Sequence, residues 1–236
     1  MNNIIFIVAI LAGLLQGLTG FGAGIVLMLV LPNYFPILKS SAMTGVIALF
    51  LCVGMIIKFR HIIKVKELFF PTILYMIASS LALIIGKGVN SVILQRIFGL
   101  FLIALAIYYL IFDKNQKVNL KKLTKVLFIL LSGICDGLFG IGGPLMVIYF
   151  LNQTDTQEEY LAQIQTFFFI NAFYLTILRI SQNLLSLNDF PYIILGGIGI
   201  VLGSQLGVYL IPRINENIVR KVTYLVIGIS GIINLF

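Results

Sequence analysis

The chain has 236 residues, of which 60% are hydrophobic and 10% charged, and its mean hydropathy is +1.11. A soluble domain is closer to one quarter charged, so this composition excludes a water-soluble globular protein and indicates a membrane protein. The formal net charge of +8 does not indicate a nucleic-acid partner, because the Lys and Arg residues lie in short loops and at the ends of apolar segments. That distribution is typical of the positive-inside bias of membrane proteins.

Eight apolar segments are candidates for crossing the lipid bilayer, which takes about 20 apolar residues. They are residues 3–31, 41–57, 68–86, 95–112, 124–151, 163–184, 191–211 and 217–236. The first segment lacks a basic start and is too long for a signal peptide, so we expect it to be retained as a helix. The pattern predicts an all-α, polytopic membrane protein with about eight transmembrane helices, forming a single transmembrane domain over residues 1–236.

Two glycine-rich breaks, 120 residues apart, interrupt the first and fifth apolar segments. They are residues 17–24 (GLTGFGAG) and 137–144 (GLFGIGGP). Small residues in the third segment also recur in the seventh, where Gly199, Gly203 and Gly207 follow Ala78, Ala82 and Gly86 by 121 positions. We therefore expect two homologous four-helix repeats with glycine-broken first helices. Repeat one covers residues 3–112, a basic cytoplasmic linker covers 113–123, and repeat two covers 124–236.

Each broken segment is long enough to cross the bilayer with an unwound centre, so we expect crossing and parallel repeats. Folding back of each broken segment would instead make the repeats inverted. With eight crossings, the two densest basic clusters, residues 58–66 and 113–125, fall on the N-terminal side. The positive-inside rule then predicts that both termini are cytoplasmic and that the acidic loop 155–159 is a solvated outer turn.

Glycine breaks at mid-membrane are tolerated only where the backbone is buried in protein or lines a cavity. A helix that restarts after such a break has unpaired N–H groups, which together with the helix dipole favour an anion. We therefore predict a small anionic substrate held by residues of the breaks and by polar side chains of the second and sixth segments. The candidates are Gln16, Thr19, Gly20, Gly22, Gly24, Thr44, Gly140, Gly142, Gly143, Gln165, Thr166 and Asn171. The alternative is that the glycines only allow close helix packing and that the polar groups are ordinary contacts between helices.

Two charged residues fall well inside apolar segments, and such residues are functional hypotheses by default. Asp136 is equivalent to Gln16 in the repeat and is a candidate for proton coupling, with helix capping as the alternative. Arg179 could pair with Asp136, bind the anion, or extend to the membrane surface. Cys52 and Cys135 lie within segments and have no metal-ligand spacing, so we expect neither a metal site nor a cofactor.

The two glycine runs resemble those of the TauE/SafE family of membrane permeases, which export sulfite and organosulfonates. With h for an apolar residue, the family patterns are GhhGhGGG near the first span and GhFGhGGP at the start of the second half, and Ala23 replaces one glycine of the first. The resemblance covers essentially the whole chain. It implies a secondary transporter that exports a small, often sulfur-containing anion across the bacterial cytoplasmic (inner) membrane.

Other classes of function have less support in the sequence. The chain lacks HExxH, GxSxG and GxxxxGK[ST] motifs, and its one His lies in a loop, so neither an enzyme nor an ATP-driven pump is expected. An anion channel with passive flux remains the alternative. The small-residue face of the seventh segment could serve packing within the chain or a homodimer.

Overall fold

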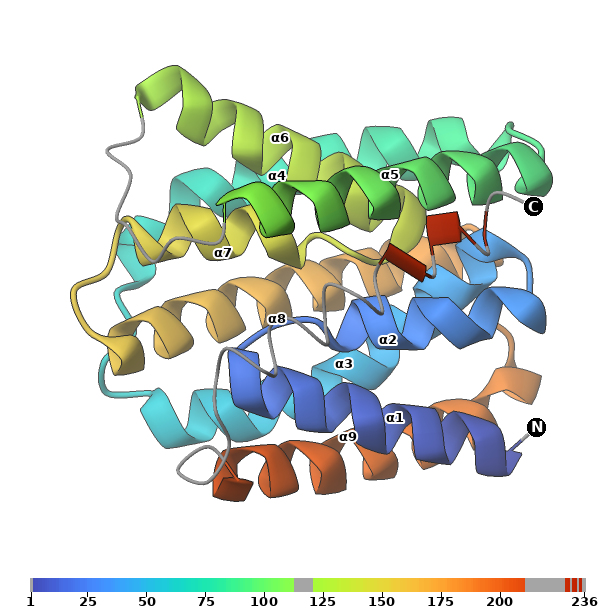
Figure 1. Cartoon of the computed structure of the whole chain (residues 1–236), viewed down its shortest axis with the longest axis horizontal. Coiled ribbons are helices and arrows are strands. Elements are labelled where there is room, and N and C mark those ends of the chain that lie inside the picture. The colour runs from blue at the N-terminus through green and yellow to red at the C-terminus, as the bar shows by residue number, and fades with distance from the viewer. Residues whose placement is uncertain (1, 113–120, 211–227, 230, 233, 235–236) are drawn as a thin grey trace.

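The computed structural model describes residues 2–112 and 121–210, together with five residues near the C-terminus, 228, 229, 231, 232 and 234. Within this part of the chain the structure consists of helices and loops without strands, which confirms the all-α prediction (Figure 1). The predicted segment 217–236 and most of the linker 113–123 lie outside the described residues.

The helices follow the same order twice along the chain. The first half contains α1 (Asn2–Thr19), α2 (Ala23–Val30), the short 3-10 helix η1 (Leu31–Asn33), α3 (Ile37–Phe59), α4 (Val65–Lys87) and α5 (Ser91–Phe112). The second half contains α6 (Lys122–Phe139), α7 (Gly143–Leu151), α8 (Gln157–Ser181), η2 (Leu187–Asp189) and α9 (Phe190–Leu210). In each half a helix breaks at glycines, a short helix follows, and long helices come next.

Four stretches of the described residues are long and apolar enough to cross a membrane: Ile37–Ile57, Val65–Lys87, Gln157–Ser181 and Leu187–Gly207. Shorter apolar helices cover Asn2–Leu18, Ala23–Asn33 and Ser91–Ile107. Large apolar side chains such as Phe69, Ile85 and Ile198 are exposed on the outer faces of these helices. That surface fits lipid better than water and makes the chain a multi-pass membrane protein.

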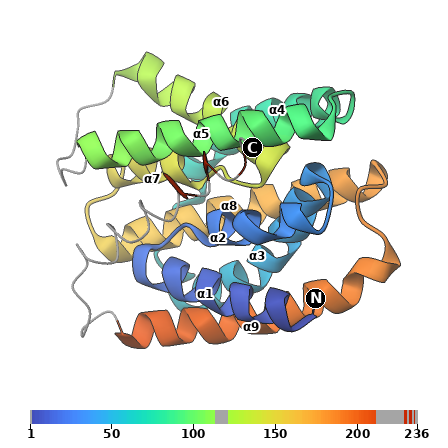
Figure 2. The ribbon, with the colours of Figure 1, turned by 45° about the vertical axis from the view of Figure 1, so that its right-hand side comes forward.

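The two broken segments fold back, so the expected crossing is wrong. Helix α2 returns alongside α1, and α7 returns alongside α6 (Figures 1 and 2). One buried cluster joins successive residues of α1 to the returning chain: Ile5, Ala9 and Ala12 with Ala23, Leu27 and Leu31. The reversal is possible because Gly20, Gly22 and Gly140 take positive φ angles of 81°, 105° and 67°, which glycine adopts without strain. We call α1–α2 the first hairpin and α6–α7 the second.

Ion pairs and hydrogen bonds identify the two ends of the helical bundle. At one end, Lys39 at the start of α3 pairs with Asp189 at 2.8 Å, and Lys87 donates to the side chain of Gln182 at 2.9 Å. At the other end, Lys64 before α4 pairs with Glu159 at the start of α8. We call these the Lys39 end and the Lys64 end. Glu159 is buried, so one residue of the acidic turn that was predicted to be solvated takes part in a structural ion pair. Its partner Lys64 belongs to a basic loop that was expected on the opposite side of the membrane.

The hairpins enter the bundle from opposite ends. Helix α1 packs along α9 in the same direction, since Gly199 faces Phe6 and Gly207 faces Leu14. Because α9 begins at the Lys39 end, α1 begins there too. Helix α6 packs along α4 in the same way, with Gly133 against Tyr75 of α4, and so begins at the Lys64 end. The repeats are therefore inverted rather than parallel.

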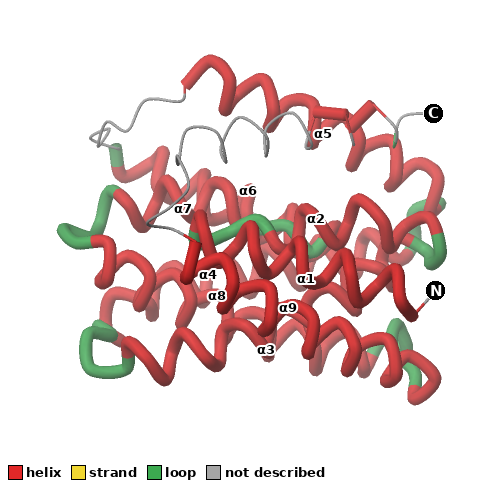
Figure 3. The backbone as a smooth tube through the Cα atoms, turned by 60° about the horizontal axis from the view of Figure 1, so that its bottom comes forward, coloured by secondary structure: helices red, strands yellow, loops and turns green. Residues whose placement is uncertain are grey.

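This arrangement corrects two further expectations. The start of α1 and the basic loop around Lys64 lie at opposite ends of the bundle, so the expectation that they share one side is wrong, and the C-terminal residues 235–236 lie outside the described part of the chain. The small-residue face formed by Gly199, Gly203 and Gly207 packs on α1 of the same chain. That face therefore serves packing within the chain and not a dimer contact. Figure 3 shows loops at both ends and the hairpin breaks in the middle.

The sequence halves are also not separate packing units. Helix α9 of the second half packs on α1 of the first, while α4 of the first half packs on α6 of the second. Two groups of helices result: α1, α2, α3 and α9 in one, and α4, α6, α7 and α8 in the other. Helices α3 and α8 form the main contact between them.

Candidate functional site

The tips of the two hairpins meet in the middle of the bundle. We define the first tip as residues 20–22 and the second as residues 140–142. A Cβ atom on Gly24 would lie 2.7 Å from the carbonyl oxygen of Gly140, so glycine is needed for this approach. Gly143 likewise faces Phe21 of the first tip. The two breaks, 120 residues apart in sequence, are thus neighbours in space.

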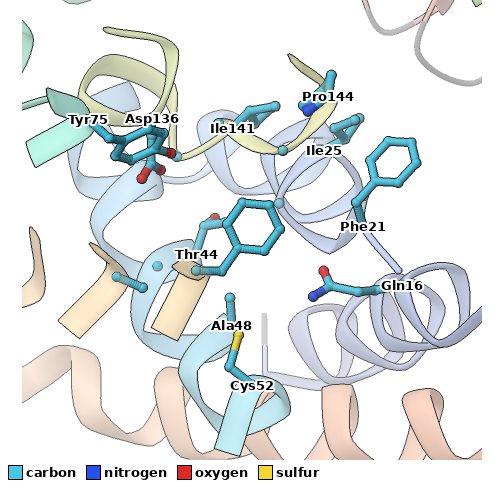
Figure 4. A pocket seen from close by; sticks show the side chains of 18 residues that line it. Gln16, Phe21, Ile25, Thr44, Ala48, Cys52, Tyr75, Asp136, Ile141 and Pro144 are labelled. Atoms are coloured by element: carbon cyan, nitrogen blue, oxygen red, sulfur yellow. The ribbon is translucent and has the colours of Figure 1, made fainter. Parts of the chain in front are cut away.

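A cavity of about 70 Å³ lies between the tips (Figure 4), and residues of α3, α4 and α8 also line it. Eight of the predicted site residues line it: Gln16, Gly22, Gly24, Thr44, Asp136, Gly140, Gly142 and Gly143. By the measure that one water needs about 10–15 Å³, this volume holds about five non-hydrogen atoms. The structure therefore brings together the residues of both glycine runs around a space of small-anion size.

Other predicted residues lie outside the cavity lining. Thr166 donates to the Ala162 carbonyl at 2.7 Å, and Asn171 donates to the Phe167 carbonyl at 2.8 Å. Both are bonds to the preceding turn of the same helix, so these two donors are occupied within α8, and a contact of either side chain with the substrate stays a prediction. The Thr19 side chain lies outside the described residues.

The first tip is held by two glutamine side chains. Gln165 donates from Nε2 to the carbonyl of Gly20 at 2.9 Å, so Gln165 and Gly20 shape the tip rather than line the cavity. Gln16 accepts at Oε1 from the backbone N–H of Ala23 at 3.1 Å. This bond occupies one of the free amides at the start of α2, so that helix start is less open to an anion than the sequence suggests.

The second tip carries a charged group in place of the equivalent amide. The Tyr75 hydroxyl of α4 hydrogen-bonds to the carboxylate of Asp136. A Cβ atom on Gly142 would overlap that hydroxyl, so glycine at this position makes room for the Tyr75–Asp136 bond. Helix α7 starts with no side-chain cap and with Pro144 in its first turn, which leaves its first amides available.

Tyr75 and Gly45 are cavity residues that sequence reasoning missed. Tyr75 belongs to an apolar helix and to no motif, and its role depends on the packing of α6 along α4. Gly45 follows the predicted Thr44, but it is a single glycine within α3 and not part of a run. Its contact with Arg179 becomes visible only when α8 is placed against α3.

Arg179 is fully buried, with 0% of its surface exposed, so extension to the membrane surface is wrong. Its Nη2 donates to the backbone carbonyl of Asp136 at 2.7 Å. Its Nε and Nη1 have no hydrogen-bond partner among the described residues. A Cβ atom on Gly45 would lie 2.7 Å from Nη1, so the guanidinium lies directly behind a residue of the cavity wall.

The remaining polar groups of the wall are uncharged. The hydroxyl of Thr44 is buried and has no hydrogen-bond partner among the described residues. Cys52 donates weakly from Sγ to Oε1 of Gln165 at 3.5 Å, and both cysteines are free. Among the described residues no group of three His, Cys, Asp or Glu side chains could hold a metal ion.

Comparisons with known proteins identify the family of the chain. The family model for sulfite exporter TauE/SafE matches residues 5–233. A probable membrane transporter protein of Methanocaldococcus jannaschii is 26% identical over 258 residues, an alignment that covers 98% of this chain and 94% of that protein. No solved structure matches the chain significantly. Since the family match includes both hairpins and nearly all of the chain, this membrane transporter belongs to the TauE/SafE sulfite exporter family.

Proposed function

We propose that the chain is a secondary transporter that exports a small anion, sulfur-containing such as sulfite or an organosulfonate, across the cytoplasmic membrane. The observation that best supports this proposal is that two glycine-broken hairpin tips, from opposite ends of the bundle, meet around one cavity. The Arg179 side chain lies next to Gly45 in the wall of this cavity. In transporters built from inverted repeats, broken helices of this kind hold the substrate near the middle of the membrane.

Several groups at the cavity favour an anion. The uncapped start of α7 presents backbone N–H groups and the positive end of a helix dipole. The Thr44 hydroxyl is a donor without a partner of its own, and Arg179 supplies a full positive charge. Asp136 offsets that charge and is the proposed site of proton coupling.

Transport requires the tips to part, which favours a transporter over a channel. Gly24 and Gly140 approach each other through the backbone, so an anion has no straight path between the two tips. We propose that the two helix groups defined above rock against each other at the α3–α8 contact. Each movement would open the cavity to one side of the membrane.

The distribution of charge suggests how the chain sits in the membrane. The Lys64 end carries Arg60, Lys64 and Lys66, together with Lys121, Lys122 and Lys125 at the start of α6, whereas Lys39, Lys87 and Arg96 belong to the other end. The positive-inside rule then places the Lys64 end in the cytoplasm and the N-terminus outside. Net export follows when the anion accumulates in the cytoplasm.

Counterflow in proteoliposomes tests this function. Vesicles containing the purified protein are loaded with unlabelled sulfite and diluted into a trace of radiolabelled sulfite. A transporter exchanges one for the other, so label should accumulate transiently above its equilibrium level. Label that rises to equilibrium without this overshoot would identify a channel, and the absence of protein-dependent entry would reject sulfite as the transported anion.

A glycine variant links counterflow to the site. Leu at Gly142 would displace the Tyr75 hydroxyl and fill the cavity, so Gly142→Leu should abolish the overshoot while the protein still inserts. The matched control is Gly54→Leu, because Gly54 in α3 faces open space and should tolerate a lipid-facing leucine. Equal counterflow in the two variants would remove the cavity from the mechanism.

A further inference from the structure

Asp136 and Arg179 carry opposite charges, one at the cavity and the other next to its wall. No direct ion pair joins the two side chains among the described contacts. The Asp136 carboxylate faces the cavity and is bound by Tyr75. The Arg179 guanidinium is bound instead to the backbone carbonyl of Asp136. Its remaining nitrogens point to no acceptor in the described part of the chain.

Gly45 connects the Arg179 guanidinium with the cavity wall. The residue lines the cavity, and the position of its missing Cβ is 2.7 Å from Nη1. A buried guanidinium with unpaired nitrogens is costly, and an oxyanion that reached it would form charge-assisted hydrogen bonds. The absence of a side chain at position 45 lets the guanidinium lie against the cavity wall.

We propose that Arg179 binds the transported anion over Gly45, that the anion thereby replaces Asp136 as the counter-charge, and that one proton is bound by Asp136 for each monoanion. This inference rests on the proposed function and adds to it the residue that recognises charge and the stoichiometry of coupling. The one bond that forms is the O–H bond of the protonated Asp136 carboxyl, which breaks again when the proton is released, and the proton and the anion enter and leave the site together.

The stoichiometry follows from keeping the site near neutrality in the middle of the membrane. In the empty site, Asp136 carries one negative charge and Arg179, which stays protonated in proteins, carries one positive charge. A bound monoanion would leave a net charge of −1, and an uncompensated charge at this depth is expensive. Protonation of Asp136 restores a net charge of zero.

The surroundings of Asp136 offer no other group that could take this role. Tyr75 faces it from α4, Arg179 from α8, and Cys135 is its neighbour on α6. Helix α3 contributes Gly45 and Thr44, and α7 begins at Gly143. Of these described groups, Asp136 is the one carboxylate, and binding of a proton by it leaves the Tyr75 contact in place.

Calorimetric titration of the detergent-purified protein measures the proton directly. The probe is sodium methanesulfonate, a compact sulfonate that remains a monoanion throughout the neutral pH range. Titrations in two buffers with different ionisation enthalpies give the number of protons taken up per anion bound. About one proton is expected for the natural protein, from the charge balance above.

Three variants separate the roles of the two charges. Asp136→Asn resembles the protonated carboxyl and should bind methanesulfonate with no uptake of a proton. Arg179→Gln should weaken binding about tenfold or more, the cost of losing a charge-assisted hydrogen bond, and Arg179→Lys should restore part of it. Thr176→Ala is the control on the same helix, since the Thr176 hydroxyl only donates to the Ala172 carbonyl, and it should match the natural protein in affinity and proton uptake.

The outcomes distinguish this inference from the proposed function. Binding without proton uptake in the natural protein would overturn the coupling, and unchanged affinity in Arg179→Gln would overturn the role of Arg179. Either result leaves anion transport standing if counterflow of sulfite is observed. Absence of both counterflow and methanesulfonate binding in the natural protein would reject the proposed function and this inference together.

Discussion

At the scale of single residues, Thr44 and Thr72 are a natural pair for comparison. Both threonines are buried, and the hydroxyl of each has no hydrogen-bond partner among the described residues. Thr44 lines the cavity, whereas Thr72 of α4 does not belong to its lining. A buried hydroxyl without a partner carries the cost of its desolvation. That cost is recovered at Thr44 only if a substrate accepts its hydrogen bond.

The prediction is that Thr44→Val weakens anion binding by about 0.5–1.5 kcal/mol, the net value of one hydrogen bond, or about two- to tenfold in Kd. Thr72→Val should leave the Kd unchanged, because this substitution removes the same kind of hydroxyl at a position that does not line the cavity. Titration of both variants with methanesulfonate checks this expectation. An equal Kd for the two would mean that the Thr44 hydroxyl does not contact the anion.

Polar residues also show where sequence reasoning reaches its limit at this scale. Gln16 and Asp136 were identified because each lies inside a glycine-broken segment, and both line the cavity. Thr166 and Asn171 had equally suitable chemistry, but each satisfies its donor on the preceding helical turn. A periodic pattern does not distinguish a side chain that bonds to its own helix from one that faces a ligand.

At the scale of helices, glycine contacts hold each hairpin against a helix of the opposite half. A Cβ atom on Gly17 would lie 2.6 Å from the carbonyl oxygen of Ser204 in α9. Gly207 of α9 in turn faces Leu14 of α1. Ion pairs also link the starts of α4 and α9, the helices that pack on the opposite half, to neighbouring helices. Asp189 pairs α9 with α3, and Lys64 pairs α4 with α8. The two pairs occupy related places in the inverted repeats with their charges reversed.

We expect Gly17→Ala to destabilise the protein by about 1–3 kcal/mol, because the added methyl group forces α1 away from α9. The control is Gly54→Ala, where a Cβ meets nothing within 4 Å and the change should be neutral or stabilise by about 0.5–1 kcal/mol. Thermal unfolding in detergent provides the comparison. A Gly17→Ala variant as stable as Gly54→Ala would show that α1 and α9 are not packed through their backbones.

At the scale of the whole molecule, the largest difference from the sequence-based expectation is the direction of the chain after each break. The positions of the breaks, the helical class and the twofold order follow from glycine spacing and hydropathy. Residues 3–31 are long enough to cross with an unwound centre, and length alone does not reveal a reversal. The reversal depends on the φ angles of Gly20 and Gly22, because glycine permits either direction.

Cysteine labelling in membranes distinguishes a hairpin from a crossing. Asn3 of α1 and Asn33 of η1 are both exposed, and in the hairpin they lie at the same end. Asn3→Cys and Asn33→Cys should therefore react with a membrane-impermeant thiol reagent from the same face. His61→Cys, at the Lys64 end, should react from the opposite face. Labelling of Asn3→Cys and Asn33→Cys from opposite faces would restore the crossing arrangement.

Three helices, α3, α4 and α5, separate the two hairpins along the chain, and their odd number has a geometric consequence. An odd number of helices leaves the second hairpin to begin at the end of the bundle opposite to the first, so the two tips can meet. An even number would bring both tips in from the same face, where they could not meet. Gln16 and Asp136, one neutral and one acidic at equivalent places of the two hairpins, make the two faces of the cavity chemically different although the hairpins that carry them are built alike.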